Sequence, residues 1–168
     1  YVAFRQIADK VNVLRDTFSP ERIGVVIGSS TSGLDVSETA FFHWQATGIL
    51  PGYYHYEAQH EMGSIAQFIA QLGELHGPAY TVSTACSASA KAFASAQGLL
   101  ASGFCDAVIT GGVDALCDLT LNGFEALSSL SRTISKPMSK NRDGLNIGEG
   151  AALFILTRDQ GPIQLCGV

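Results

Sequence analysis

The sequence predicts an α/β fold built on a mixed, mostly parallel sheet covered by helices. Short apolar runs, each bounded by glycine or polar residues, predict strands at 23–27, 79–84 and 107–113. Segments with helical periodicity separate these strands, and such alternation is typical of parallel sheets with helices on their faces. Two late apolar runs, 151–157 and 163–168, predict a strand pair, which adds an antiparallel member.

The helices follow from periodicity and from their end signals. A first helix is expected from about residue 2 to 18, because Ser19 and Pro20 then break it. The segment 63–75 is the best amphipathic helix, since its apolar residues share one face. These residues are Ile65, Phe68, Ile69, Leu72 and Leu75. Helices are also expected at 37–44, 86–102 and 116–130. The segment 86–102 consists mostly of alanine and serine, so we expect it in the interior.

Composition excludes several classes of function. The 168 residues are 46% hydrophobic and 15% charged, which indicates one globular domain with a substantial core. The formal net charge is −5 and no run of lysine and arginine covers the domain, so a nucleic-acid interface is not expected. The apolar stretches are too short to span a membrane. We therefore expect a cytoplasmic protein.

Both ends of the sequence predict a truncated chain. Tyr1 opens directly on a helical pattern, and the chain stops inside the predicted strand 163–168. A terminal buried strand without a neighbour would leave backbone groups unpaired. We expect a fragment in which residues outside this sequence carry part of the chemistry.

The four cysteines divide into two groups. Cys105, Cys117 and Cys166 lie in apolar surroundings, as buried free thiols usually do. Cys86 instead lies where a predicted strand ends and a helix of small residues begins. The unpaired N–H groups of a helix N-terminus stabilise a thiolate and also bind a developing oxyanion. From this local pattern alone, a nucleophile and a small buried side chain are equally compatible with Cys86.

Residues 84–90, Thr-Ala-Cys-Ser-Ala-Ser-Ala, resemble the nucleophile motif of the condensing enzymes of fatty acid and polyketide synthesis. Residues 22–29, 77–82, 106–114 and 142–151 resemble further segments of the β-ketoacyl-(acyl carrier protein) synthases, in the order of that family. The resemblance covers nearly the whole chain. It implies a thiolase-like fold of two similar α/β halves. This chain is then most of the first half, with 163–168 as the start of the second.

The resemblance also implies a mechanism. Cys86 accepts an acyl group from a carrier-protein thioester, and a malonyl thioester then loses carbon dioxide and attacks the acyl-enzyme. The backbone N–H of Cys86 forms part of the oxyanion hole. Two histidines and a lysine of the second half assist, and they lie outside this chain. The expected partners are acyl carrier protein and a second synthase subunit, in a homodimer or a heterodimer. The fragment alone is expected to be inactive in condensation.

Two segments depart from the family pattern or vary within it. Thr31 lies in the turn 28–33, where some members have a bulkier residue lining the acyl pocket, so we expect an altered substrate preference. Residues 136–141 read Lys-Pro-Met-Ser-Lys-Asn, where many members have Arg-Pro-Phe-Asp. This difference is interpreted as a feature of a subgroup.

Other sequence signals have smaller roles. His60 and Glu61 begin like a zinc-protease motif, but Ser64 stands where the second histidine is required, so no metal site is expected. The turn 28–33 lacks the lysine of a phosphate loop, and no cofactor is expected.

Two further segments each have two interpretations. The aromatic run 51–59 forms either a dimer interface or ordinary core packing. The second segment is a basic loop. The loop residues are Arg132, Lys136, Lys140 and Arg142. This loop either docks carrier protein or is merely solvated, with Arg142 anchored to a carboxylate.

Two alternative functions remain open from sequence. One is a related thiolase-superfamily enzyme that uses coenzyme A esters. The other is a non-catalytic, chain-length-factor-like partner subunit that shapes the product tunnel of a catalytic one. Such partner subunits typically lack the nucleophilic cysteine, so Cys86 favours the enzyme.

Overall fold

A four-stranded mixed sheet lies at the centre of the computed structural model, which describes residues 1–159, 161 and 163–167. The strands are β1 (Ile23–Gly28), β2 (Ala79–Val82), β3 (Ala107–Asp114) and β4 (Gly150–Thr157). Their order is β2-β1-β3-β4, with β1 parallel to both β2 and β3 and β4 antiparallel to β3. The predicted mixed, mostly parallel sheet is therefore confirmed.

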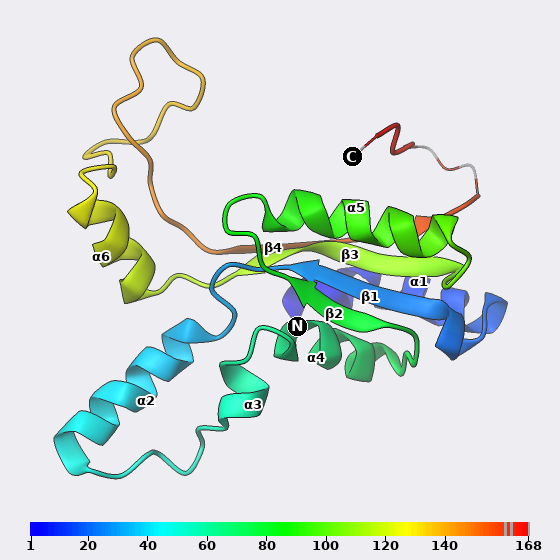
Figure 1. Ribbon diagram of the computed structural model, residues 1–168, viewed down its shortest axis with the longest axis horizontal. Helices are drawn as coiled ribbons and strands as arrows, with labels where there is room; N and C mark the ends of the chain where they lie inside the picture. Colours follow the sequence, from blue (N-terminus) through cyan, green and yellow to red (C-terminus); the bar gives the residue numbers. More distant parts are fainter. Residues whose placement is uncertain (160, 162, 168) are drawn as a thin grey trace.

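Helices cover both faces of this sheet (Figure 1). They are α1 (Val2–Thr17), α2 (Leu34–Thr47), α3 (Tyr56–Gln59), α4 (Ser64–Gly73), α5 (Ala88–Ala101) and α6 (Asp118–Ala126), with a 3-10 turn at Pro20–Arg22. α5 lies on one face, and α1 and α4 lie on the other. α2, α3 and α6 extend from the sheet on the side where β1 ends. The short helix α3 had no counterpart in the sequence prediction.

The core divides between the two faces because strand side chains alternate in direction. Ile23, Val25 and Ile27 of β1 pack in one apolar cluster with residues of α1 and α4. Val26 belongs to a second cluster, which includes Ala92 and Ala96 of α5. Every residue of β1 is buried, which explains why its sequence is a continuous apolar run.

The predicted strand at 163–168 is wrong for the residues that the structure describes. Residues 163–167 form no strand, and Val168 lies outside the described residues. β4 instead pairs along its full length with β3, from Gly150 opposite Asp114 to Thr157 opposite Ala107. A short apolar run becomes a strand only where a neighbour offers hydrogen-bonding groups, and here β3 supplies them to β4.

Two predictions of burial are also wrong. α5 is not enclosed by this chain: Ala88, Ala92, Ala96 and Leu100 are buried on one side, while other positions are exposed. The second wrong prediction is Cys166, which is exposed, whereas Cys105 and Cys117 are buried as expected. In both cases apolar composition by itself does not show which neighbours are present to cover a side chain.

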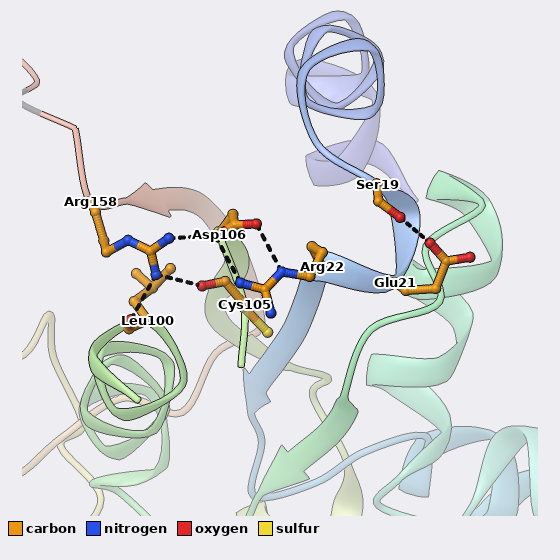
Figure 2. A network of polar contacts seen from close by, with 7 residues as sticks. All are labelled: Ser19, Glu21, Arg22, Leu100, Cys105, Asp106 and Arg158. Carbon is orange, nitrogen blue, oxygen red and sulfur yellow. Dashed lines mark hydrogen bonds and ion pairs between the residues drawn. The ribbon is translucent and has the colours of Figure 1, made fainter. Parts of the chain in front are cut away.

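At the amino ends of β1 and β3, ion pairs link three segments (Figure 2). Arg22 donates from Nε and Nη2 to the two carboxylate oxygens of Asp106, at 2.9 and 3.0 Å. Arg158, just after β4, pairs with the same carboxylate and donates to the carbonyl oxygens of Leu100 and Cys105, each at 3.0 Å. The hydrogen bond from Arg22, with help from Arg158, lowers the pKa of Asp106 from 3.8 to about 2.

Membrane spans and metal clusters are both missing from the described residues. None of the helices there is both long and apolar enough to cross a membrane. No group of three or more His, Cys, Asp or Glu side chains among those residues is arranged to hold a metal ion.

Candidate active site

The carboxyl ends of three parallel strands meet at one edge of the sheet. β2 leads into residues 83–87, β1 into 29–33, and β3 into 115–117. The backbone N–H of Ser29 donates to the carbonyl of Val82 at 3.1 Å, so the first two connections are joined where they leave the sheet. In open α/β sheets this edge is where ligands bind, because the connecting loops can vary there without disturbing the strands.

Cys86 lies in the tight turn between β2 and α5, two residues before the helix, and it is exposed. Ala85 before it has a φ of +52°, a left-handed conformation that is costly for a residue with a side chain. The Ser87 hydroxyl holds this turn by donating to the Thr84 carbonyl at 2.9 Å, and the Ala88 N–H donates to the Ala85 carbonyl at 2.9 Å. The turn therefore presents the thiol outward from a constrained backbone.

The backbone N–H of Cys86 belongs to the turn that leads into α5. It precedes α5, whose first N–H groups carry the positive end of the helix dipole. This geometry suits an oxyanion hole in which the Cys86 N–H supplies one donor.

Two glycines let α5 begin against the sheet. Gly28 of β1 pairs with Gly112 of β3 in the strand register. A Cβ on Gly28 would lie 2.4 Å from the backbone of Ala88 and Ser89, and one on Gly112 would lie 2.0 Å from the Ser89 hydroxyl. Only hydrogen fits at these two positions, so glycine fixes the depth of the helix start and, with it, the position of Cys86.

Thr31 follows β1 at the same edge, and it is buried. Its hydroxyl donates to Oδ1 of Asp114 at 3.2 Å and accepts from the N–H of Ala115 at 3.0 Å. The hydroxyl is therefore occupied inside the turn. Thr31 and Cys86 leave the same edge of the sheet, on neighbouring connections.

A cavity of about 470 Å³ lies beside these turns, at the end of β3 and the start of β4. Its walls come from α2, α3, α4 and the two strands, and they include Val36, Ile65, Phe68, Asp114 and Glu149. Neither Cys86 nor Thr31 lines it, although Ser32 and Gly33 of the Thr31 turn do. The Cys86 thiol and this cavity are therefore separate features of one edge.

Comparison with known proteins identifies the family. Residues 2–161 match the family model described as "Beta-ketoacyl synthase, N-terminal domain". The chain belongs to the β-ketoacyl synthase family. Its expected resemblance to this family is thus confirmed over nearly the whole chain.

Relatives of this β-ketoacyl synthase domain include an acyl-carrier-protein synthase and a polyketide synthase subunit. The chain is 35% identical over 158 residues to the chloroplastic 3-oxoacyl-[acyl-carrier-protein] synthase I of Arabidopsis thaliana, covering 88% of this chain and 32% of that protein. It is 33% identical to the tetracenomycin polyketide synthase ketoacyl synthase alpha subunit of Streptomyces glaucescens, covering 82% and 35%. The chain therefore spans about a third of the length of these relatives.

The fold of the domain also agrees with solved ketosynthases. The chain matches the ketosynthase ApeO of Xenorhabdus doucetiae, solved in complex with its chain length factor ApeC, with a TM-score of 0.84 and 40% identity. The match covers 95% of this chain and 40% of that one. A β-ketoacyl synthase of Burkholderia phymatum matches with a TM-score of 0.78 and 26% identity, covering 92% and 40%. The predicted thiolase-like fold is confirmed.

Cys105 and His60 of this synthase domain have structural surroundings. Burial raises the pKa of the Cys105 thiol, which disfavours its reactive thiolate form. The Nδ1 atom of His60 lies 2.8 Å from the Ser37 hydroxyl oxygen, and the His60 ring stacks on Tyr56. Tyr54 donates to the same hydroxyl at 3.1 Å, so these side chains tie the segment after α2 back onto α2.

The basic loop of the synthase domain is exposed at Arg132, Lys136, Lys140 and Arg142. Arg142 donates to the backbone carbonyl of Ser139 at 3.1 Å. Among the ion pairs of the described residues, none joins Arg142 to a carboxylate, so the expected carboxylate anchor is wrong. A role of this loop in carrier-protein docking stays a prediction.

Two carboxylates at this edge were missed as site residues by the sequence reasoning. Asp114 accepts a hydrogen bond from Thr31 in the turn after β1. Glu38 of α2 accepts from the N–H groups of Asp118 and Leu119, at 2.8 and 2.7 Å, and so caps α6. An acidic residue at the end of a buried strand was the available signal for Asp114. No local signal marks Glu38, because its partners lie 80 residues away.

Proposed function

We propose that the full-length protein is a β-ketoacyl-(acyl carrier protein) synthase in which Cys86 is the acyl-accepting nucleophile. The observation that carries this proposal is the exposed thiol of Cys86 on a constrained turn at the start of α5, within a domain of this family. The related synthases named above support the same reaction class.

The first half-reaction loads Cys86. Its thiolate attacks the carbonyl carbon of an acyl thioester on carrier protein, and the negative charge on oxygen is stabilised by backbone N–H donors that include that of Cys86. The new carbon–sulfur bond replaces the one to the carrier, whose thiol leaves. The exposed position of Cys86 admits the long prosthetic arm on which such an acyl group is carried.

The second half-reaction forms the carbon–carbon bond. A malonyl group on carrier protein loses carbon dioxide, and the resulting carbanion attacks the carbonyl carbon of the acyl-Cys86 thioester. The carbon–sulfur bond then breaks and the thiolate of Cys86 returns. The two histidines and the lysine that the resemblance assigns to this step lie outside the present chain. The same holds for the second oxyanion donor.

Carrier protein and a second synthase subunit are the proposed partners. The related ketosynthase ApeO forms a complex with its chain length factor. We therefore propose that this domain also functions in a homodimer or heterodimer. The expected cytoplasmic location stays a prediction, because the Arabidopsis relative is named chloroplastic.

The decisive experiment is intact-protein mass spectrometry of the full-length protein after incubation with an acyl-carrier thioester. Cys86→Ala tests the nucleophile, and Cys166→Ala is a matched control, since Cys166 is also exposed but lies on no strand-to-helix turn. We expect one acyl adduct in the wild type and in Cys166→Ala, and none in Cys86→Ala. An adduct that persists in Cys86→Ala contradicts the assignment.

Two further readouts separate the alternatives. Release of carbon dioxide from malonyl-carrier protein distinguishes a synthase from a non-catalytic partner subunit, in which neither acylation nor decarboxylation is expected. Replacing carrier protein by coenzyme A distinguishes the carrier-dependent synthase, whose condensation should then fall strongly. A condensation rate with coenzyme A thioesters equal to that with carrier-protein thioesters would favour the thiolase-superfamily alternative.

A further inference from the structure

Ser87 stands at the N-cap of α5, but its side chain is bonded to the Cys86 turn and not to the helix. A serine at an N-cap usually stabilises the helix by accepting a hydrogen bond from an N–H of the first turn. Among the described residues, Ser87 makes no such side-chain cap bond. Its hydroxyl donates backward to the carbonyl oxygen of Thr84 at 2.9 Å, and the Thr84 hydroxyl oxygen lies 3.0 Å away. The hydroxyl therefore serves the turn that precedes the helix.

This hydroxyl supplies the shorter of two bonds that close the turn of residues 84–87. The backbone N–H of Ser87 also donates to the Thr84 carbonyl, but at 3.4 Å. That distance is longer than the usual range for an N–H donor, whereas 2.9 Å is ordinary for a hydroxyl donor. Without the hydroxyl, the closure between Thr84 and Ser87 would depend on the weak backbone bond.

The peptide at the centre of this turn carries the N–H of Cys86. Ala85 before it has a φ of +52°, and turns with a positive φ at the second residue are dominated by glycine, asparagine and aspartate. An alanine in this conformation is strained and persists only where the surrounding bonds hold it. Turn types differ in the rotation of their central peptide, and this rotation changes the direction of its N–H. The bonds that close the turn therefore determine where the N–H of Cys86 points.

We propose that Ser87 is a positioning residue whose hydroxyl holds the Ala85–Cys86 peptide so that the Cys86 N–H faces the carbonyl oxygen of the acyl thioester. The inference rests on the proposed function, in which this N–H is one of the oxyanion donors. Ser87 contacts neither the reacting carbon nor the leaving group in this scheme. It acts through the orientation of the peptide between Ala85 and Cys86.

Two reactions of the same thiol separate this role from general support of the turn. Acylation by a carrier-protein thioester passes through a tetrahedral oxyanion, so its rate depends on the N–H donors. Alkylation by iodoacetamide is a displacement in which the thiolate forms a carbon–sulfur bond and iodide leaves, and no oxyanion develops. Its rate depends only on the thiolate and on access to it. The ratio of the acylation rate to the alkylation rate at Cys86 therefore reports the oxyanion donor.

The test uses the full-length protein and three substitutions in the turn. Ser87→Ala removes the hydroxyl, Ser87→Thr keeps it, and Thr84→Val removes only the Thr84 hydroxyl while the carbonyl acceptor stays. Ser102→Ala is the matched control, because the Ser102 hydroxyl also donates to a carbonyl three residues earlier, that of Leu99 at 3.2 Å, but at the far end of α5. Both rates are measured by mass spectrometry of the peptide that contains Cys86.

We expect the rate ratio to fall by about fivefold to tenfold in Ser87→Ala, the effect of one hydrogen bond. This fall is smaller than the loss of a whole oxyanion donor, because the N–H is misdirected and not removed. Ser87→Thr and Ser102→Ala should keep the wild-type ratio. Thr84→Val should lower it less than Ser87→Ala, since the Thr84 carbonyl still accepts from Ser87.

The outcomes distinguish this inference from the proposed function. If the wild type takes no acyl group on Cys86, the proposed function fails and the inference fails with it. If the wild type is acylated but the ratio is unchanged in Ser87→Ala, or both reactions slow equally, only the inference is wrong. Should Ser87→Ala not fold, Thr84→Val is compared with Ser102→Ala: a lower ratio supports the inference and an equal ratio overturns it.

Discussion

At the amino edge of the parallel strands, two guanidinium groups bind the carboxylate of Asp106, whereas at the carboxyl edge Asp114 accepts from hydroxyls and backbone N–H groups only. The first arrangement joins three segments by two long arginine side chains that are 40% and 50% exposed. At the carboxyl edge, Asp114 binds the backbone of the turn after β1. This turn lies next to the glycines against which α5 packs at its start.

The difference shows that the two edges of one sheet are held by different kinds of contact. Long charged side chains adapt to small shifts, and water screens their ion pairs, so the amino edge tolerates change. Backbone contacts at Gly28 and backbone hydrogen bonds to Asp114 do not adapt in this way. The carboxyl edge, which carries the Cys86 turn, is therefore the one whose contacts adapt less, and this suits the nucleophile proposed for Cys86.

Of the substitutions that test this comparison, Gly28→Ala is expected to lower the free energy of unfolding most. The added Cβ meets the backbone of Ala88 and Ser89, which cannot move aside without displacing α5, so we expect a loss of about 3 kcal/mol in the free energy of unfolding. Urea denaturation of the full-length protein measures it. Gly98→Ala in α5 is the control, because its Cβ meets no atom within 4 Å and should be neutral or slightly stabilising. Equal stability of the two variants would contradict the argument.

Asp106→Asn is expected to have a smaller effect that depends on pH. The folded-state pKa of Asp106, about 2, lies below its ordinary value of 3.8. Its contribution is therefore fully present above about pH 4 and is lost as the pH falls through about 2. We expect a lower melting temperature for the variant at neutral pH and convergence with the wild type near pH 2. Asp16→Asn on the exposed face of α1 serves as control, and an identical pH profile for wild type and Asp106→Asn would refute the linkage.

Glu38→Ala is expected to have the smallest effect. It removes the acceptor for two N–H groups at the start of α6, a loss comparable to that of a helix cap, about 1 kcal/mol. Hydrogen exchange of the first turn of α6 should increase while that of β1 stays unchanged. Glu125→Ala, at an exposed position of the same helix, controls for the loss of a carboxylate. Equal exchange in both variants would show that the cap contributes nothing.

Much of the fold was predictable because its signals are local. The helices α1 and α4 follow from the periodicity of apolar residues, and β1 follows from an uninterrupted apolar run. The position of Cys86 between a strand and a helix also follows from its immediate neighbours. Residues 163–167 were predicted wrongly because a strand is defined by its partner, and sequence pattern does not reveal whether one is present.

Three features could be inferred without coordinates: the family, the alternation of strands and helices, and Cys86 as the candidate nucleophile. Each of them depends on adjacent residues or on the order of motifs along the chain. Only the folded chain shows that Asp114 binds the turn around Thr31, that Glu38 caps α6, and that Gly28 faces the start of α5. These contacts join residues some 60 to 85 positions apart. Such pairings arise only when the sheet brings its strand ends together, so no local pattern of residues encodes them.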